Sequence, residues 1–199
     1  MRVAFMTVTC FCVILSGSLA TAGEQGHGKG MDMKAMMETY QKAAIPGAPH
    51  QRLAKLEGSW STRTKEWMEP NKPPRESAGS CQMKTLLGGR FLQQECQGNM
   101  MGHPYQGIGT TGYDNIGKKY VSTWVDSMAT GIFKMEGSAS RDGKTIILLG
   151  AHQAPGGGQM EHRAVWTLLD DNHQTFVMFG THQGGPEMKM MEITYTRKP

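Results

Sequence analysis

The sequence predicts an all-β domain in which about ten antiparallel strands close into an up-and-down barrel, preceded by one or two helices. Beyond Gly58 the apolar residues alternate, and short runs of β-branched and aromatic residues are separated every eight to twelve residues by turn residues. The links are too short for parallel crossovers, which need about a dozen residues or more. Closure into a barrel removes the long edges that a flat sheet would expose. The expected strands cover residues 60–68, 78–87, 90–98, 104–113, 118–126, 131–141, 144–153, 159–169, 173–182 and 188–197.

Residues 1–22 are typical of a secretory signal peptide. Arg2 supplies a positive charge, Val3 to Leu15 form an apolar stretch, and Ala20-Thr21-Ala22 matches an A-x-A cleavage site. The stretch is shorter than the about 20 apolar residues of a spanning helix, so we expect cleavage rather than an uncleaved anchor. The expected product is periplasmic or secreted, with no stable membrane anchor after signal cleavage. The chain then divides into the signal peptide 1–22, an N-terminal segment 23–57 and a β-barrel domain 58–199.

An amphipathic helix is expected in the N-terminal segment, over residues 32–44. Met33, Met36, Met37, Tyr40 and Ala44 recur at steps of three and four residues, which places them on one face. The residue at position 32 is an aspartate that caps such a helix, and a proline at position 46 ends it. A second short helix is expected over 49–56. The sequence leaves open whether the first helix covers the barrel mouth or packs on its wall.

A disulfide is predicted from the register of one hairpin. If Gly88 and Gly89 form a two-residue turn, Cys81 lies directly opposite Cys96. Alternation then makes the cysteines a hydrogen-bonded pair with a Cα separation of about 5.5 Å, which a disulfide tolerates. An exported protein favours oxidation of the pair, and two free buried thiols are the alternative.

A second hairpin is predicted from the dipeptide Asp142-Gly143, which is a strong turn signal between alternating strands. In this register one mainly apolar face pairs Phe133, Met135 and Ala139 with His152, Gly150 and Ile146.

The barrel interior is the predicted binding site, because ten strands enclose more space than the eight-stranded size that side chains fill. Alternation places Trp60 and Glu66 on one face, and Trp124 and Asp126 on one face. A carboxylate inside an apolar barrel is costly unless paired, so an inward Glu66 would contact the ligand. Asp126 is expected on the solvated outer face. The ligand-binding candidates are Trp60, Glu66, Trp124, Phe133, His152, Trp166 and Arg197.

Composition excludes several function classes. The formal net charge is only +4, and Lys and Arg are scattered without interleaved aromatic residues, so nucleic acid is not an expected partner. Residues 107–112 match G-x-G-x-x-G, but a turn and another strand follow instead of the helix that dinucleotide binding requires. We therefore expect these glycines to relieve crowding in a barrel strand or to bend it. The sequence contains no H-E-x-x-H, G-x-S-x-G, C-x-x-C or phosphate-loop motif, which makes an enzyme the less favoured class.

Methionine is unusually frequent, with 17 residues in the chain, and several lie beside histidines. Thioether and imidazole groups suit copper, particularly Cu(I), so Met100, Met101 and His103 form a candidate metal site. The competing interpretation is that these methionines fill the core or coat an adaptable apolar surface. His182 beside Met188, Met190 and Met191 shows the same pattern.

Two resemblances add to these inferences. The segment Leu56-Glu57-Gly58-Ser59-Trp60, with Tyr195-Thr196-Arg197-Lys198 at the end of the last strand, resembles the calycin superfamily of lipocalin-like barrels. That resemblance implies that Trp60 and Arg197 form a cation–π lid across one barrel end. The strings LEGSW, LLGGRFLQQE, GIGTTGYDN, KKYVSTWVDSM and MEITYTRK resemble an uncharacterised bacterial domain-of-unknown-function family, which implies no activity.

Two hypotheses follow from the sequence. The leading one is an exported barrel that binds a small apolar ligand, with few polar groups for orientation. The alternative is a copper- or haem-handling protein that uses Met and His, and an enzyme with a pocket carboxylate ranks third. The cofactor, the ligand identity and the oligomeric state are unknown from sequence.

Overall fold

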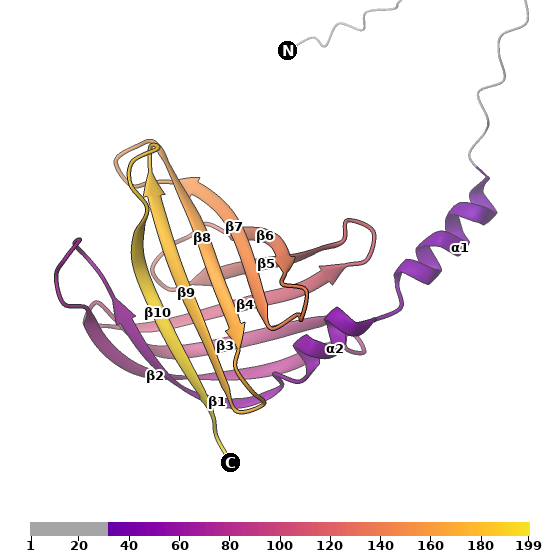
Figure 1. The fold of residues 1–199 in the computed structure, drawn as a ribbon, viewed down its shortest axis with the longest axis horizontal. Helices are drawn as coiled ribbons and strands as arrows, with labels where there is room; N and C mark the ends of the chain where they lie inside the picture. The colour runs from indigo at the N-terminus through magenta and orange to yellow at the C-terminus, as the bar shows by residue number, and fades with distance from the viewer. Residues whose placement is uncertain (1–31) are drawn as a thin grey trace, which may run out of the picture.

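The alternating region folds into one closed antiparallel barrel, in which every strand pairs with its neighbours in sequence and β1 pairs with β10. The computed structural model describes residues 32–199, shown in Figure 1, so the predicted signal peptide lies outside the described residues. The predicted up-and-down barrel is confirmed, and all ten strand ranges agree within three residues. The strands are β1 Gly58–Glu66, β2 Arg75–Leu86, β3 Phe91–Met100, β4 His103–Asp114, β5 Lys119–Asp126, β6 Phe133–Ala139, β7 Thr145–Gln153, β8 Gln159–Leu168, β9 His173–His182 and β10 Met188–Arg197.

Two helices precede the barrel, α1 Met33–Ala43 and α2 Ala48–Ala54. Asp32 caps α1 as expected, because its side chain accepts a hydrogen bond from the backbone N of Lys34 at 3.0 Å. Helix α1 projects away from the barrel, so it covers neither the mouth nor the wall (Figure 1). None of its residues is buried. Neither helix has the length and apolar character needed to cross a bilayer.

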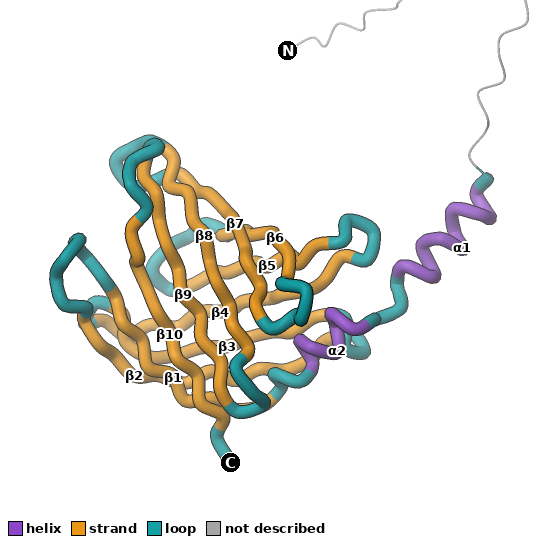
Figure 2. The backbone as a smooth tube through the Cα atoms, viewed as in Figure 1, coloured by secondary structure: helices purple, strands orange, loops and turns teal. Residues whose placement is uncertain are grey.

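Helix α2 and the last strand seal one end of the barrel (Figure 2). The indole of Trp60 is fully buried there, and its Nε1 donates to the carbonyl of Leu56 at 2.9 Å. Arg197 stacks on Trp60 with its guanidinium carbon 4.3 Å from the ring centroid, which is the cation–π pair that the calycin resemblance implied. Gly58 makes this possible: its φ is +135°, and a Cβ there would lie 2.6 Å from Arg197 Nη1. The G-x-W motif therefore leaves space for the arginine.

The β2–β3 hairpin has the predicted register, and Cys81 is bonded to Cys96. The predicted turn is wrong in length: residues 87–90 form a four-residue link, with Leu87, Gly88 and Gly89 at positive φ. A link of four residues instead of two leaves the same residues of β2 and β3 opposite each other. It exchanges the hydrogen-bonded and non-hydrogen-bonded positions along the hairpin, however. The Cα atoms of the two cysteines are 4.0 Å apart, close to the separation of a non-hydrogen-bonded pair and not the predicted 5.5 Å.

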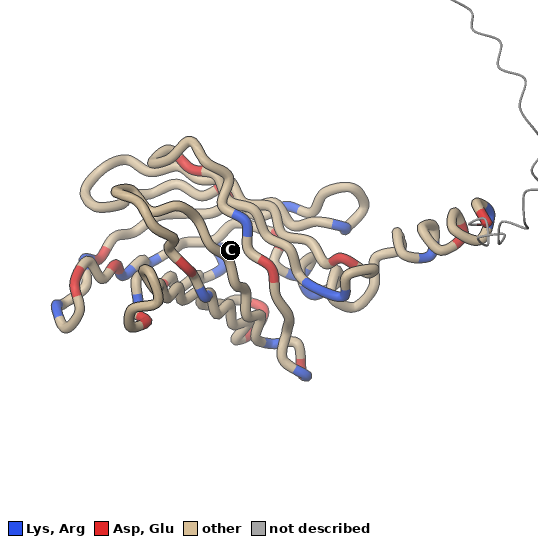
Figure 3. Tube along the Cα trace, turned by 90° about the horizontal axis from the view of Figure 1, so that it is seen from above, with Lys and Arg blue, Asp and Glu red and all other residues tan. Residues whose placement is uncertain are grey.

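The β6–β7 hairpin confirms the second predicted register, because Ala139 pairs with Ile146 and Met135 with Gly150. The side chains of Met135 and Ile146 are buried in the core. Along the outer surface, basic and acidic residues interleave and form no face of one sign in the view of Figure 3. This distribution agrees with the scattered charges of the sequence.

Candidate functional site

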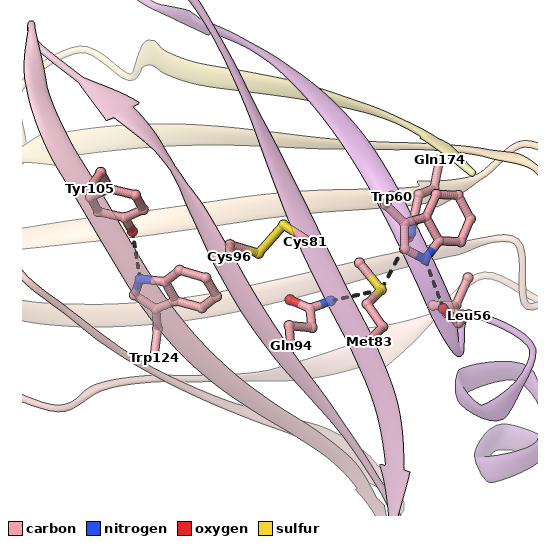
Figure 4. The surroundings of a disulfide bond; sticks show 9 residues. All are labelled: Leu56, Trp60, Cys81, Met83, Gln94, Cys96, Tyr105, Trp124 and Gln174. Carbon is pink, nitrogen blue, oxygen red and sulfur yellow. Dashed lines mark hydrogen bonds between the residues drawn. A yellow bond between two sulfur atoms is a disulfide. The ribbon is translucent and has the colours of Figure 1, made fainter. Parts of the chain in front are cut away.

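A cavity of about 140 Å³ lies inside the barrel. Its lining comes from β1, β2, β3, β4, β5, β6, β7, β8, β9 and β10, so no local segment builds it. Most of the lining is apolar or aromatic, and Glu66 is its charged member. The disulfide lies in the wall between this site and the sealed end (Figure 4).

Trp124 forms one wall of the cavity because two glycines make room for it. A Cβ on Gly107 would lie 2.8 Å from Cε2 of the indole, and one on Gly109 would lie 2.6 Å from Cε3. Atoms from both ends of the indole therefore lie against the inner face of β4. This contact explains two glycines of the G-x-G-x-x-G string, and it confirms that they relieve crowding.

Trp124 is held by polar contacts with two side chains at the mouth. Its Nε1 donates to the hydroxyl of Tyr105 at 2.9 Å and to Asp126 Oδ2 at 3.1 Å (Figure 4 draws the first). The Tyr105 hydroxyl donates to Asp126 at 3.4 Å. Burial, followed by the charge of Asp126, raises the pKa of Tyr105 above its ordinary value of 10, so the phenol stays neutral. The predicted outward orientation of Asp126 is wrong, because these partners satisfy its carboxylate on the Trp124 side of β5.

Glu66 points inward, as predicted from Trp60, and lines the cavity at the end of β1. It is only 7% exposed. Its Oε2 accepts a hydrogen bond from the backbone N of Met101 at 3.3 Å, which connects the end of β1 to the β3–β4 turn.

Trp166 and a pair of hydroxyls make further polar contacts in the lining. Trp166 Nε1 donates to Gln174 Oε1 at 2.7 Å, and this glutamine is fully buried. Thr111 Oγ1 and Ser122 Oγ are 2.9 Å apart. Each of these groups therefore has a hydrogen-bond partner within the barrel.

The candidates Phe133 and His152 meet a third ring, that of His162, at the barrel end opposite α2. Phe133 lines the cavity and makes edge contacts with both imidazoles, with ring centroids 5.6 and 5.1 Å apart. His152 lies outside the lining, with its Nδ1 3.2 Å from Nε2 of His162. His162 Nδ1 is buried and has no hydrogen-bond partner among residues 32–199. Burial, and then the nearby His152, lower the pKa of His162 to about 4.

Apart from His152, the structure places the predicted ligand-binding residues in two positions. Trp124, Glu66, Phe133 and Trp166 line the cavity, whereas Trp60 and Arg197 lie at the sealed end outside the lining. Ligand binding by any of them stays a prediction.

The candidate metal residues occupy the β3–β4 turn. Met100 lines the cavity and pairs with His103, whereas Met101 is 43% exposed and lies in the turn itself with φ at +51°. Within residues 32–199, no group of three or more His, Cys, Asp or Glu side chains is placed to hold a metal ion.

The sequence analysis missed Tyr105, which lines the cavity and anchors Trp124. Alternation along β4 carried the signal, because Tyr105 shares a face with Gly107 and Gly109. Gln94 was missed in the same way, since it shares a face with Cys96 on β3.

These features define a class of protein: a ten-stranded, calycin-like up-and-down barrel with one end sealed and a cavity inside. Residues 45–197 match the family model described as "Protein of unknown function (DUF1579)", and the chain belongs to this family. The comparison with curated proteins gives no match.

Two solved structures show the same fold. The crystal structure of Rv2717c from M. tuberculosis is similar with a TM-score of 0.56 and 16% identity, over 78% of this chain and 100% of that chain. The S-type phycobiliprotein lyase CPES from Guillardia theta is similar with a TM-score of 0.52 and 10% identity, over 75% of this chain and 92% of that chain. At these identities the likeness concerns the fold alone.

Proposed function

We propose that this protein is an exported binding protein that holds a small, largely apolar molecule inside its barrel. The observation that carries the proposal is the cavity itself, whose lining surface is mainly apolar and also includes polar side chains such as Glu66, Gln94 and Thr111. Binding sites for small molecules have this composition.

The volume of the cavity limits the size of the ligand that can bind. Its volume of about 140 Å³ is close to that of an engineered protein cavity of about 150 Å³ that binds benzene. A body of one ring or a short alkyl chain therefore fits, and this size favours such a ligand over a macrocycle such as haem.

Export is supported by the signal-peptide pattern of residues 1–22 and by the disulfide, since such bonds persist in oxidising compartments. The mass of the protein isolated from its own host tests this. We expect a mature chain that begins at Gly23 and carries an oxidised cysteine pair. A full-length reduced chain would contradict export.

Native mass spectrometry of the same material tests ligand binding, and we expect a non-covalent organic adduct. A matched pair of variants locates it. Thr64→Phe fills the cavity from its lining, whereas Thr196→Phe adds the same ring to the exposed outer face of β10. The adduct should be lost in the first variant and kept in the second. Equal occupancy in both, with both folded, would refute binding in the cavity.

A soft-metal site is the second candidate function, and one observation favours it. Gly180 pairs with His162, and the sulfurs of Met160 and Met190 both lie over Gly180 on the inner face. Thioether and imidazole groups beside one another suit Cu(I). Titration with Cu(I) against a competing chelator should show tight binding that His162→Leu weakens. Absence of binding, or an unchanged affinity in that variant, would remove this candidate.

A further inference from the structure

We propose that the ligand of the cavity is an organic ammonium ion, a protonated amine carried on an apolar body about the size of one ring. This inference rests on the proposed binding function and adds the charge of the ligand to it.

The first observation is the buried carboxylate of Glu66. It lines the cavity and is 7% exposed, and among the described residues only the Met101 N–H donates to it. Within residues 32–199 it takes part in no ion pair. A carboxylate removed from water without a cation is costly, so a cation supplied by the ligand would be stabilised there.

The second observation is that the part of the chain described by the structure provides no internal cation for this carboxylate. No lysine or arginine lines the cavity. Arg75 of β2 is the cross-strand partner of Glu66, but its residue is exposed, and it makes no ion pair with Glu66. Among residues 32–199, the cavity lining therefore offers Glu66 no positively charged side chain as a partner.

The third observation is the aromatic wall that Trp124 adds to the same cavity. Because one side of the Trp124 indole lies against Gly107 and Gly109, its opposite side is left for the cavity that it lines. An ammonium group is attracted to the face of an indole. The Tyr105 phenol and the Asp126 carboxylate hold this indole in place, and Asp126 adds a second negative charge near the mouth.

Together these groups discriminate among ligands by charge. A cation gains a carboxylate and an aromatic face, a neutral ligand gains only burial, and an anion is repelled by Glu66 and Asp126. The apolar body of the ligand would occupy the rest of the lining, where Phe133 and Trp166 lie.

Isothermal titration calorimetry with three probes tests the inference on the wild-type protein. Benzylamine, benzyl alcohol and benzoate share one ring and differ in the charge of the head group at neutral pH. We expect benzylamine to bind at least about tenfold more tightly than benzyl alcohol, as for a hydrogen bond to a charged group, with benzoate the weakest. Equal affinities for benzylamine and benzyl alcohol, or preference for benzoate, would overturn the proposal.

Two variants assign the preference to Glu66. Glu66→Gln should abolish the advantage of benzylamine and leave benzyl alcohol binding unchanged. The control is Glu95→Gln, which changes an exposed carboxylate on the outer face of β3 that pairs with Lys84, and it should keep the full preference. A preference that survives in Glu66→Gln contradicts the role of this residue.

The failures of the two proposals are distinguishable. If benzyl alcohol binds and no charge preference exists, the ammonium inference fails while binding in the cavity stands. If none of the three probes binds, both proposals fail for ligands of this size. Should Glu66→Gln not fold, the charge series on the wild-type protein decides the question.

Discussion

Replacing Arg197 with methionine tests how the barrel end is sealed. The guanidinium donates three hydrogen bonds to backbone carbonyls: Nη2 to Lys55 at 2.7 Å, Nη1 to Glu57 at 2.6 Å and Nε to Asp171 at 2.8 Å. It also stacks on Trp60. One side chain thus joins the end of α2, the β8–β9 link and the first strand. Methionine keeps the aliphatic stem and removes all four contacts.

The expected loss follows from these contacts. A net hydrogen bond contributes about 1 kcal/mol, and a partly exposed cation–π pair contributes about 0.5 to 1 kcal/mol. The sum predicts that the free energy of unfolding falls by about 3.5 to 4 kcal/mol. For a domain of this size, the melting temperature should fall by about 7 to 16 °C. Lysine at the same position keeps the charge but cannot reproduce the fork of donors, so it should recover less than half of the loss.

Urea unfolding followed by tryptophan fluorescence measures the effect. Arg63→Met is the control, because Arg63 lies exposed on the outer face of β1. It should change the unfolding free energy by less than about 0.5 kcal/mol. If Arg197→Met is no less stable than this control, the contacts at the sealed end do not hold the barrel closed as argued.

Three further predictions concern the wall and the mouth. Cys81→Ser should lower the free energy of unfolding by about 3 kcal/mol, because the disulfide closes a loop between cysteines that are 15 residues apart. Wild-type protein in reductant should unfold at the urea midpoint of this variant, and a midpoint insensitive to reductant would argue against the bond. Gly109→Val should lower the free energy of unfolding by about 1 to 3 kcal/mol, because a Cβ at this position collides with the indole of Trp124. Gly131→Ala, whose Cβ meets nothing within 4 Å, should be neutral, and equal losses in these two glycine variants would refute the steric account. The pKa of His162 is lowered from 6.5 to about 4 in the folded protein. Between pH 6.5 and pH 4 the unfolded chain therefore binds more protons than the folded chain, and the free energy of unfolding decreases as the pH falls through this range. His162→Leu should lose stability less steeply than wild type from pH 6.5 to 4 in urea titrations, and parallel pH profiles would contradict the assignment.

The strands and the disulfide could be predicted because their signals are local. The alternating period and the turn residues located each strand, and the cysteine spacing agreed with the Gly88-Gly89 turn on one register. The length of that turn was predicted wrongly, because a two-residue and a four-residue link share the same partners. Only the backbone conformation of residues 87–90 decides between them.

The orientation of Asp126 shows why the site was harder to predict than the strands. A carboxylate on an apolar face is costly, so the outer face was the reasonable expectation from β5 alone. The partner that makes the inner position acceptable is Tyr105, which comes from β4. The sequence pattern of one strand carries no information about hydrogen-bond partners on the next.

By itself, the sequence determined the number and order of the strands, the antiparallel meander and the pairing of Cys81 with Cys96, because alternation, turn chemistry and short links act between residues close along the chain. The tertiary structure decided which side chains enclose the cavity and how large it is. It also left Glu66 without a cation among the described residues and placed α1 away from the barrel. These properties depend on closure between β1 and β10, which brings together residues separated by most of the chain, and on how each side chain fills the space that closure creates.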